Sequence, residues 1–130
     1  MDPVVHFEMP ALDRERMANF YTKVFNWETN MLGPEMGNYV LVTITEKDEK
    51  NMPKERGQIN GGFFPKTDDS PIKYPSVVIA VKDIKVSMKK VEEAGGKVFG
   101  EPMEIPGTGM YVAFSDTEGN MASMLQPTPM

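Results

Sequence analysis

The chain has 130 residues, a net charge of −5 at pH 7 and no cysteine. The length suits one domain with a buried core, the acidic charge disfavours a nucleic-acid partner, and the missing cysteines exclude disulfides and thiolate metal sites. We expect a cytoplasmic protein with no membrane partner, because the N-terminus does not resemble a signal peptide and no apolar run approaches the roughly 20 residues of a membrane span.

The first half of the chain predicts a strand, a helix and three further strands. Val4 to Met9 alternates between apolar and polar residues, and Asp13 is placed to cap a helix that runs to Phe25. In that helix an apolar stripe recurs at the 3.6-residue period, formed by Met17, Phe20, Tyr21, Val24 and Phe25. The three strands are predicted at Trp27–Leu32, Tyr39–Thr45 and Ile59–Phe64, with an exposed hairpin loop over Glu46–Arg56.

The second half repeats this order after a polar linker at residues 66–73. Ser76 to Val81 predicts a strand, and Asp83 is placed to cap a helix whose apolar residues are Ile84, Met88 and Val91. Gly95 and Gly96 then supply a helix stop. The last three strands are predicted at Lys97–Glu104, Met110–Ser115 and Met121–Gln126.

The two halves look like copies of one module. Gly37-Asn38-Tyr39-Val40 matches Gly109-Met110-Tyr111-Val112 at a spacing of 72 positions, and the two helix caps lie 70 positions apart. We therefore expect an α+β protein in which two βαβββ modules form a curved mixed sheet around a cleft, with helices on the outer face. Residues 1–130 make a single domain on this interpretation, with module one at 1–65, a linker at 66–73 and module two at 74–127.

Several motifs resemble the vicinal oxygen chelate superfamily, which includes glyoxalase I, bleomycin-resistance proteins and extradiol dioxygenases. The first module carries Val5-His6-Phe7-Glu8-Met9-Pro10, Phe20-Tyr21 and Val24-Phe25-Asn26-Trp27. The second carries Val81-Lys82-Asp83-Ile84 and the turn Phe114-Ser115-Asp116-Thr117-Glu118-Gly119-Asn120. The resemblance covers nearly the whole chain and implies the duplicated fold described above.

The resemblance also implies where a divalent metal would be held, by about four His or Glu side chains from four strands. His6 occupies the first such position, seven residues before Asp13. The matching position of the second module holds Ser76, the last-strand position holds Ser123, and the fourth strand offers Gly61 or Gly62. Because a single imidazole cannot hold a metal against water, a divalent-metal cofactor is possible but disfavoured, and we expect no cofactor.

His6 and Glu8 form the one pair with potential for chemistry. They are two residues apart on one predicted strand and so share a face, with Val5, Phe7 and Met9 on the other. Together they could perform acid–base catalysis, since a carboxylate can fix the imidazole tautomer and raise its basicity. They could instead bind a ligand, or His6 could simply hydrogen-bond Glu8 in a pocket wall. A metal site made by His6 and Glu8, with Glu101 or Glu104 nearby, is a further alternative.

Other residues are candidates for contacting a ligand. The aromatic ones, which would stack on a flat ligand or else belong to the core, are Trp27, Tyr39, Phe63 and Tyr111. The polar ones, which would orient it, are Asn60, Ser76 and Ser123.

Three functions remain open at this point. The first is a metal-free small-molecule-binding protein with a cleft lined by Met and aromatic residues. The second is an enzyme, a lactoylglutathione-lyase-related lyase or a dioxygenase, with an unconventional site around His6 and Glu8. The third is an interaction module, supported only by the exposed loop. A homodimer is implied by the resemblance alone.

Overall fold

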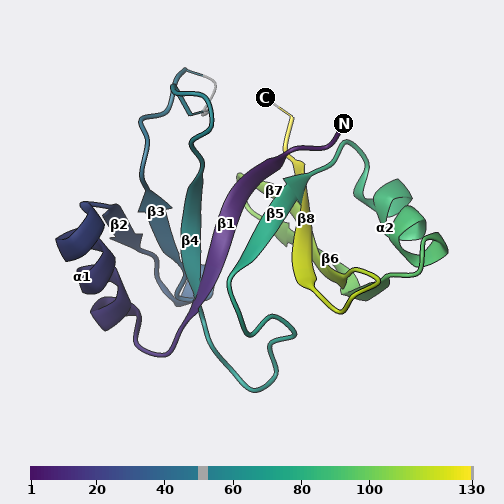
Figure 1. Ribbon diagram of the computed structural model, residues 1–130, viewed down its shortest axis with the longest axis horizontal. Coiled ribbons are helices and arrows are strands. Elements are labelled where there is room, and N and C mark those ends of the chain that lie inside the picture. The colour runs from purple at the N-terminus through teal and green to yellow at the C-terminus, as the bar shows by residue number, and fades with distance from the viewer. Residues whose placement is uncertain (50–52, 130) are drawn as a thin grey trace. The chain divides into compact units, whose positions relative to one another are not determined.

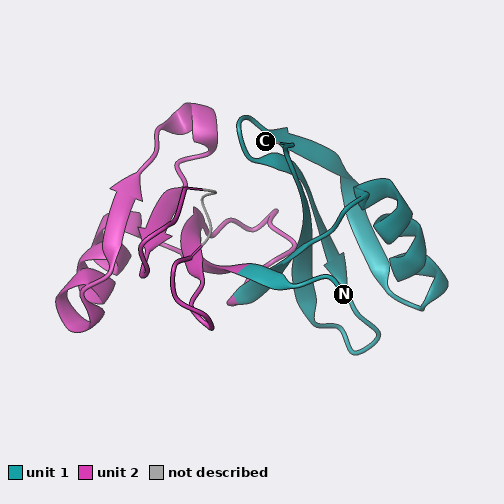
Figure 2. Cartoon of the chain, turned by 90° about the horizontal axis from the view of Figure 1, so that it is seen from above, with its two compact units in different colours: residues 1–5, 76–130 teal, residues 6–75 magenta. Residues whose placement is uncertain are grey.

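The computed structural model describes residues 1–49 and 53–129. The chain divides into two compact units, His6–Pro75 and a second one that combines Met1–Val5 with Ser76–Met130 (Figure 2). We refer to them as the N-terminal and C-terminal units and describe each by itself.

The N-terminal unit holds one helix and a four-stranded sheet. Its elements are β1 (Val4–Ala11, which begins in the other unit), α1 (Arg14–Phe25), β2 (Glu28–Met31), the 3₁₀ turn η1 (Pro34–Met36), β3 (Val40–Thr43) and β4 (Asn60–Pro65). The strand order is β2-β3-β4-β1, with β1 and β4 parallel and the other pairs antiparallel (Figure 1). The predicted strand–helix–strand–strand–strand order is confirmed, whereas η1 was not predicted.

Helix α1 begins where its sequence predicts. The Asp13 side chain accepts from the Arg16 amide, and the helix ends at Asn26, whose φ of 61° is left-handed. Ala18, Met17 and Tyr21 pack against the sheet, in a cluster with the wholly buried Val40 and Phe63.

The predicted apolar stripe of α1 is too wide. Phe20, Val24 and Phe25 are 54%, 55% and 57% exposed. The sheet contacts only the narrower series Met17, Ala18 and Tyr21, so the buried face of α1 is narrower than its apolar stripe.

The C-terminal unit repeats the order of elements. It contains β5 (Ser76–Ala80), α2 (Ile84–Glu93), β6 (Lys97–Ile105), β7 (Gly109–Ser115) and β8 (Met121–Pro127). Its strand order is β5-β8-β7-β6, with β5 and β8 parallel and the other pairs antiparallel. Asp83 caps α2 through the amides of Lys85 and Val86. The predicted stripe is confirmed, because Ile84, Met88 and Val91 all belong to the hydrophobic cluster.

The two units together confirm an α+β fold built from two βαβββ modules with mixed sheets. Between β3 and β4 the chain forms the predicted exposed loop, in which Lys47 and Pro53 make an isolated antiparallel bridge. Residues 50–52 of that loop lie outside the described part of the chain. Within residues 1–49 and 53–129, none of the helices has the length and apolar character needed to cross a membrane.

Candidate functional site

Successive side chains of β1 point to opposite faces of the sheet, one toward the core and the other toward the candidate site. Phe7 and Met9 pack into the cluster beneath α1. His6 and Glu8 have the opposite parity, so they lie on the sheet face that α1 does not cover. Glu8 is only 7% exposed, which is unusual for a carboxylate and requires hydrogen-bond donors around it.

One such donor is Tyr39. Its hydroxyl donates to Oε2 of Glu8 at 2.8 Å and lies 3.0 Å from Nε2 of His6. His6 and Glu8 are therefore linked through a tyrosine hydroxyl, a link that the sequence did not predict. Together we call His6, Tyr39 and Glu8 the hydroxyl-bridged triad.

A glycine on the strand between them allows Tyr39 to reach Glu8. In the register of the sheet, Gly62 of β4 lies between Glu8 of β1 and Leu41 of β3. A Cβ atom at Gly62 would overlap the ring and hydroxyl of Tyr39. The tyrosine ring thus lies across β4 in the space that a side chain at position 62 would occupy.

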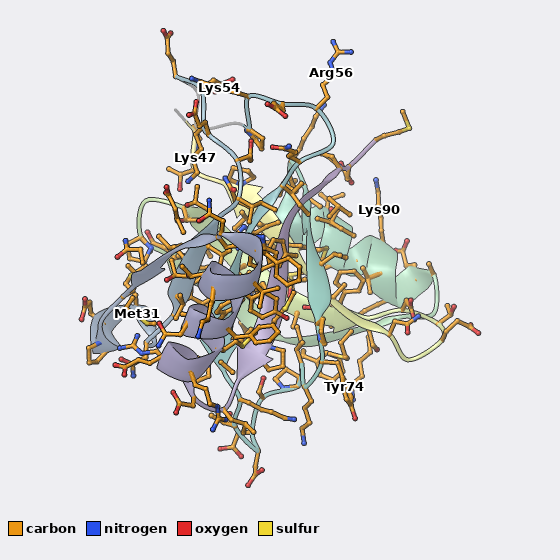
Figure 3. All side chains as sticks on the ribbon, turned by 60° about the vertical axis from the view of Figure 1, so that its left-hand side comes forward. Met31, Lys47, Lys54, Arg56, Tyr74 and Lys90 are labelled. Carbon is orange, nitrogen blue, oxygen red and sulfur yellow. The ribbon has the colours of Figure 1, made fainter. Side chains whose placement is uncertain are left out.

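His6 is held in its neutral form. Its pKa is lowered from 6.5 to about 4, first by burial and then by the positive charge of Lys47. Lys47 belongs to the loop between β3 and β4, which also carries Lys54 and Arg56 (Figure 3). The direction is opposite to the rise in basicity that a neighbouring carboxylate could cause, because burial and the charge of Lys47 both disfavour the protonated ring.

Asn60 pairs with His6 in the register of β1 and β4, whereas two aromatic candidates lie elsewhere in the N-terminal unit. The Asn60 side-chain oxygen accepts from the amides of Ile44 and Thr45 at 2.8 and 3.1 Å, so it ties down the start of the loop after β3. Trp27 and Phe63 pack with Tyr21, at ring-centroid distances of 4.6 and 5.5 Å. These two rings are part of the core cluster beneath α1, on the opposite face from the triad.

The C-terminal unit holds the remaining three candidates. The Tyr111 hydroxyl lies 2.6 Å from the Ser123 hydroxyl, and Ser123 has no exposed surface. Ser76 is the one residue in the described part of the chain with a buried side-chain polar atom that lacks a hydrogen-bond partner. Gly62 and Ser123 occupy corresponding places, because they pair with Glu8 and Val78 in the parallel strand pair of each module.

Few of the positions considered for a divalent metal carry a strong donor. His6 and Glu8 both interact with one tyrosine hydroxyl, and Gly62 has no side chain to offer. Ser76 and Ser123 present neutral hydroxyls, which are weak ligands beside imidazole or carboxylate. Over residues 1–49 and 53–129, no three His, Cys, Asp or Glu side chains are grouped so as to hold a metal ion. Glu101 and Glu104 are exposed residues of β6.

Comparison with known proteins identifies the family to which this chain belongs. The family model described as Glyoxalase/Bleomycin resistance protein/Dioxygenase superfamily matches residues 4–124. The chain belongs to this superfamily. The predicted resemblance is thereby confirmed at the level of the family.

This chain matches its sequence relatives over different fractions of their length. It is 30% identical over 117 residues to a glyoxylase-like domain-containing protein of Didymella fabae, covering 87% of this chain and 84% of that one. It is 28% identical over 122 residues to the anthracycline biosynthesis protein DnrV of Streptomyces peucetius, covering 87% and 42%. The chain spans less than half the length of the bacterial relatives that it matches first.

Solved structures share the fold at low sequence identity. One is methylmalonyl-CoA epimerase from Streptomyces coelicolor in complex with 2-nitronate-propionyl-CoA. It aligns with a TM-score of 0.69 at 13% identity, covering 97% of each chain. At this identity the likeness establishes the fold.

The sequence predicted only part of the hydroxyl-bridged triad. His6, Glu8 and Tyr39 were all candidates, and the alternation in β1 placed the first two on one face. The contribution of Gly62 was missed, although a glycine inside a strand is a signal for close approach by another group. Lys47 was seen only as part of an exposed loop.

Proposed function

We propose that this chain is a small-molecule-binding member of the superfamily that works without a resident metal. The observation that carries the proposal is the Tyr39 hydroxyl, which lies between the imidazole of His6 and the carboxylate of Glu8. These two groups are the strongest ligands the site offers, and both are already directed at an organic hydroxyl. A cation there would have to break two hydrogen bonds and displace the tyrosine ring.

The same groups suit the recognition of an organic ligand. A binding site of this kind needs a few polar groups held in fixed positions on an otherwise apolar wall. The triad supplies them on the sheet face that α1 leaves uncovered, and the hydrogen bonds of Tyr39 keep them in place before a ligand arrives. Such pre-organisation lowers the entropy that binding has to overcome.

Calorimetric titration of the chelator-stripped protein with Zn²⁺, Ni²⁺, Fe²⁺ and Mn²⁺ tests the metal-free part of the proposal. We expect wild type and His6→Ala to give the same weak or absent heats. Tyr39→Phe is the informative third protein, because it removes the competing hydroxyl and leaves both ionisable groups. Stoichiometric, tight binding to wild type that is lost in His6→Ala would refute the proposal.

A thermal-shift screen tests the binding part. A ligand at 100 times its Kd stabilises a folded protein by about 2.7 kcal/mol, which is readily seen as a rise in Tm. We expect hits among uncharged aromatic and amphipathic compounds, with smaller shifts in Tyr39→Phe. A broad library that never shifts the wild-type Tm would leave the proposal without support and would count against it.

An enzyme of the lyase or dioxygenase type, built around His6 and Glu8, is the second candidate. It is favoured by the continuous path His6–Tyr39–Glu8, along which a proton could pass between imidazole and carboxylate. It is weakened by the low pKa of His6, because an effective general base has a pKa near the working pH. An activity that survives His6→Ala unchanged would eliminate this candidate.

A further inference from the structure

Arg14 connects α1 to the segment that carries Tyr39. Its guanidinium group donates to the carbonyl of Leu32 at 2.6 Å and to that of Asn38 at 3.1 Å. Leu32 and Asn38 are the residues on either side of the turn 33–37. One terminal nitrogen of the guanidinium group, Nη1, therefore binds both ends of this turn.

The turn itself is closed by backbone bonds that end at Tyr39. The amide of Leu32 donates to the Tyr39 carbonyl at 2.9 Å, and the Asn38 amide donates to the Gly33 carbonyl at 3.0 Å. Asn38 has a φ of 56°, a left-handed conformation that asparagine adopts more readily than most other non-glycine residues. Arg14 binds the carbonyl of this residue, which directly precedes Tyr39, and so helps to fix where β3 begins.

The position of Tyr39 decides where the protons of the triad lie. A tyrosine hydroxyl has one proton, and with Glu8 ionised this proton is donated to the carboxylate. The hydroxyl oxygen can then only accept from His6, so Nε2 of the ring must carry its proton. In a neutral imidazole the other nitrogen, Nδ1, is consequently an unprotonated acceptor.

We propose that Arg14 is a positioning residue: by holding Tyr39 between His6 and Glu8, it fixes His6 as the Nε2–H tautomer and leaves Nδ1 as the acceptor for a ligand's hydroxyl or N–H group. The ligand class is set by the direction of that bond. A neutral compound with a donor is favoured, and one whose only polar group is an acceptor is not. This last part rests on the proposed small-molecule-binding function, whereas the tautomer does not.

Nuclear magnetic resonance tests the tautomer without any ligand. The chain has one histidine, so ¹⁵N-histidine labelling gives a single pair of ring signals. At pH 7 we expect wild type to show one protonated and one unprotonated nitrogen, with the proton on Nε2. Arg14→Ala should raise the share of the Nδ1–H form several-fold, and Arg14→Lys should restore the wild-type pattern in part.

Two controls separate positioning from general loss of structure. Arg16→Ala removes an exposed arginine from the same helical turn and should leave the tautomer unchanged. Tyr39→Phe removes the hydroxyl and should abolish the preference in a folded protein. A wild-type ring protonated on Nδ1, or an Arg14→Ala variant with the wild-type pattern, would overturn the proposal.

Phenol and anisole test the acceptor, because they share a ring and differ in one donor. At millimolar concentration, phenol should shift the Nδ1 signal of wild type more than anisole does. Equal shifts, or none from either compound, would overturn the assignment of Nδ1. If a library screen also finds no ligand while the tautomer depends on Arg14, then the proposed function fails and the positioning role stands.

Discussion

At the scale of single residues, the candidate site depends on the buried carboxylate of Glu8, the partly buried imidazole of His6 and the hydroxyl between them. Glu8 is nearly inaccessible, and burial would be costly for it without the hydrogen bond from Tyr39. His6 meets the same environment by staying neutral, as its lowered pKa shows. The two groups respond differently because a carboxylate can accept several donors, whereas an imidazolium beside Lys47 would add a second positive charge.

The pKa of His6 predicts how stability depends on pH. In the unfolded chain the ring titrates near 6.5, and in the folded protein near 4, so the unfolded state binds more protons between these values. The contribution of His6 is therefore fully present above pH 6.5 and is lost as the pH falls toward 4, by up to about 3 kcal/mol. Urea unfolding of wild type and His6→Gln across pH 4 to 7.5 measures it. A variant with the same slope as wild type would contradict the prediction.

Gly62 is predicted to tolerate no side chain while Tyr39 is present. Alanine at position 62 would overlap the tyrosine, so we expect Gly62→Ala to lower the free energy of unfolding by about 1–3 kcal/mol. In a Tyr39→Ala background the same change should cost much less, because the overlapping ring is gone. A double-mutant cycle measured by denaturant unfolding gives the coupling, and strictly additive effects would disprove the contact.

The sequence alone could place His6 and Glu8 on one face but could not place the Tyr39 hydroxyl. The alternation within β1 is local, whereas the position of Tyr39 depends on the registers of β1, β4 and β3. It also depends on the turn after β2, where Arg14 binds two carbonyls from a distance of 18 and 24 residues in sequence. Contacts of that kind leave no periodic signal.

At the scale of elements, helix ends were more predictable than helix faces. Both caps are aspartates with extended backbone, at φ of −134° and −139°, and both bond amides of the first turn. The face of α1 was over-assigned because aromatic residues on an exposed surface look the same in sequence as buried ones. Phe20 and Phe25 still contact the ring of Tyr21, at centroid distances of 5.0 and 5.9 Å.

The two caps offer a matched comparison. Removal of either side chain leaves first-turn amides without their partner, so Asp13→Ala and Asp83→Ala should each lower the free energy of unfolding by about 1 kcal/mol. Asp69→Ala, at an exposed position of the 66–73 linker, is the control and should change it by less than about 0.5 kcal/mol. Circular dichroism during urea unfolding measures all three. A cap variant that behaves like the control would show that its bond adds no stability.

At the scale of the whole chain, the described residues include two clusters of packed hydrophobic side chains, one in each unit, with no member in common. The internal sequence repeat predicted this duplication, because each module has its own helix and its own apolar strand face. The repeat could not show that β1 starts in one unit and continues in the other, since that division depends on contacts between distant strands.

Separate clusters predict separate local stability. Val42 and Val112 are both almost fully buried, in the N-terminal and C-terminal clusters respectively. Val42→Ala should speed amide exchange mainly in residues 6–75, and Val112→Ala mainly in residues 76–129, each by a local loss on the order of 2 kcal/mol. Hydrogen exchange followed by mass spectrometry resolves the two regions. Equal acceleration throughout the chain in both variants would show a single cooperative unit instead.

The fit of Tyr39 over Gly62 also constrains the descent of this chain. A carboxylate gained at position 62 while the tyrosine stays would meet the ring, and a tyrosine lost first would leave a void over β4. Each single step is expected to destabilise the fold, so the effects of substitutions at the two positions should depend on each other. Among relatives of this chain, we therefore expect Gly62 and Tyr39 to be kept or replaced together.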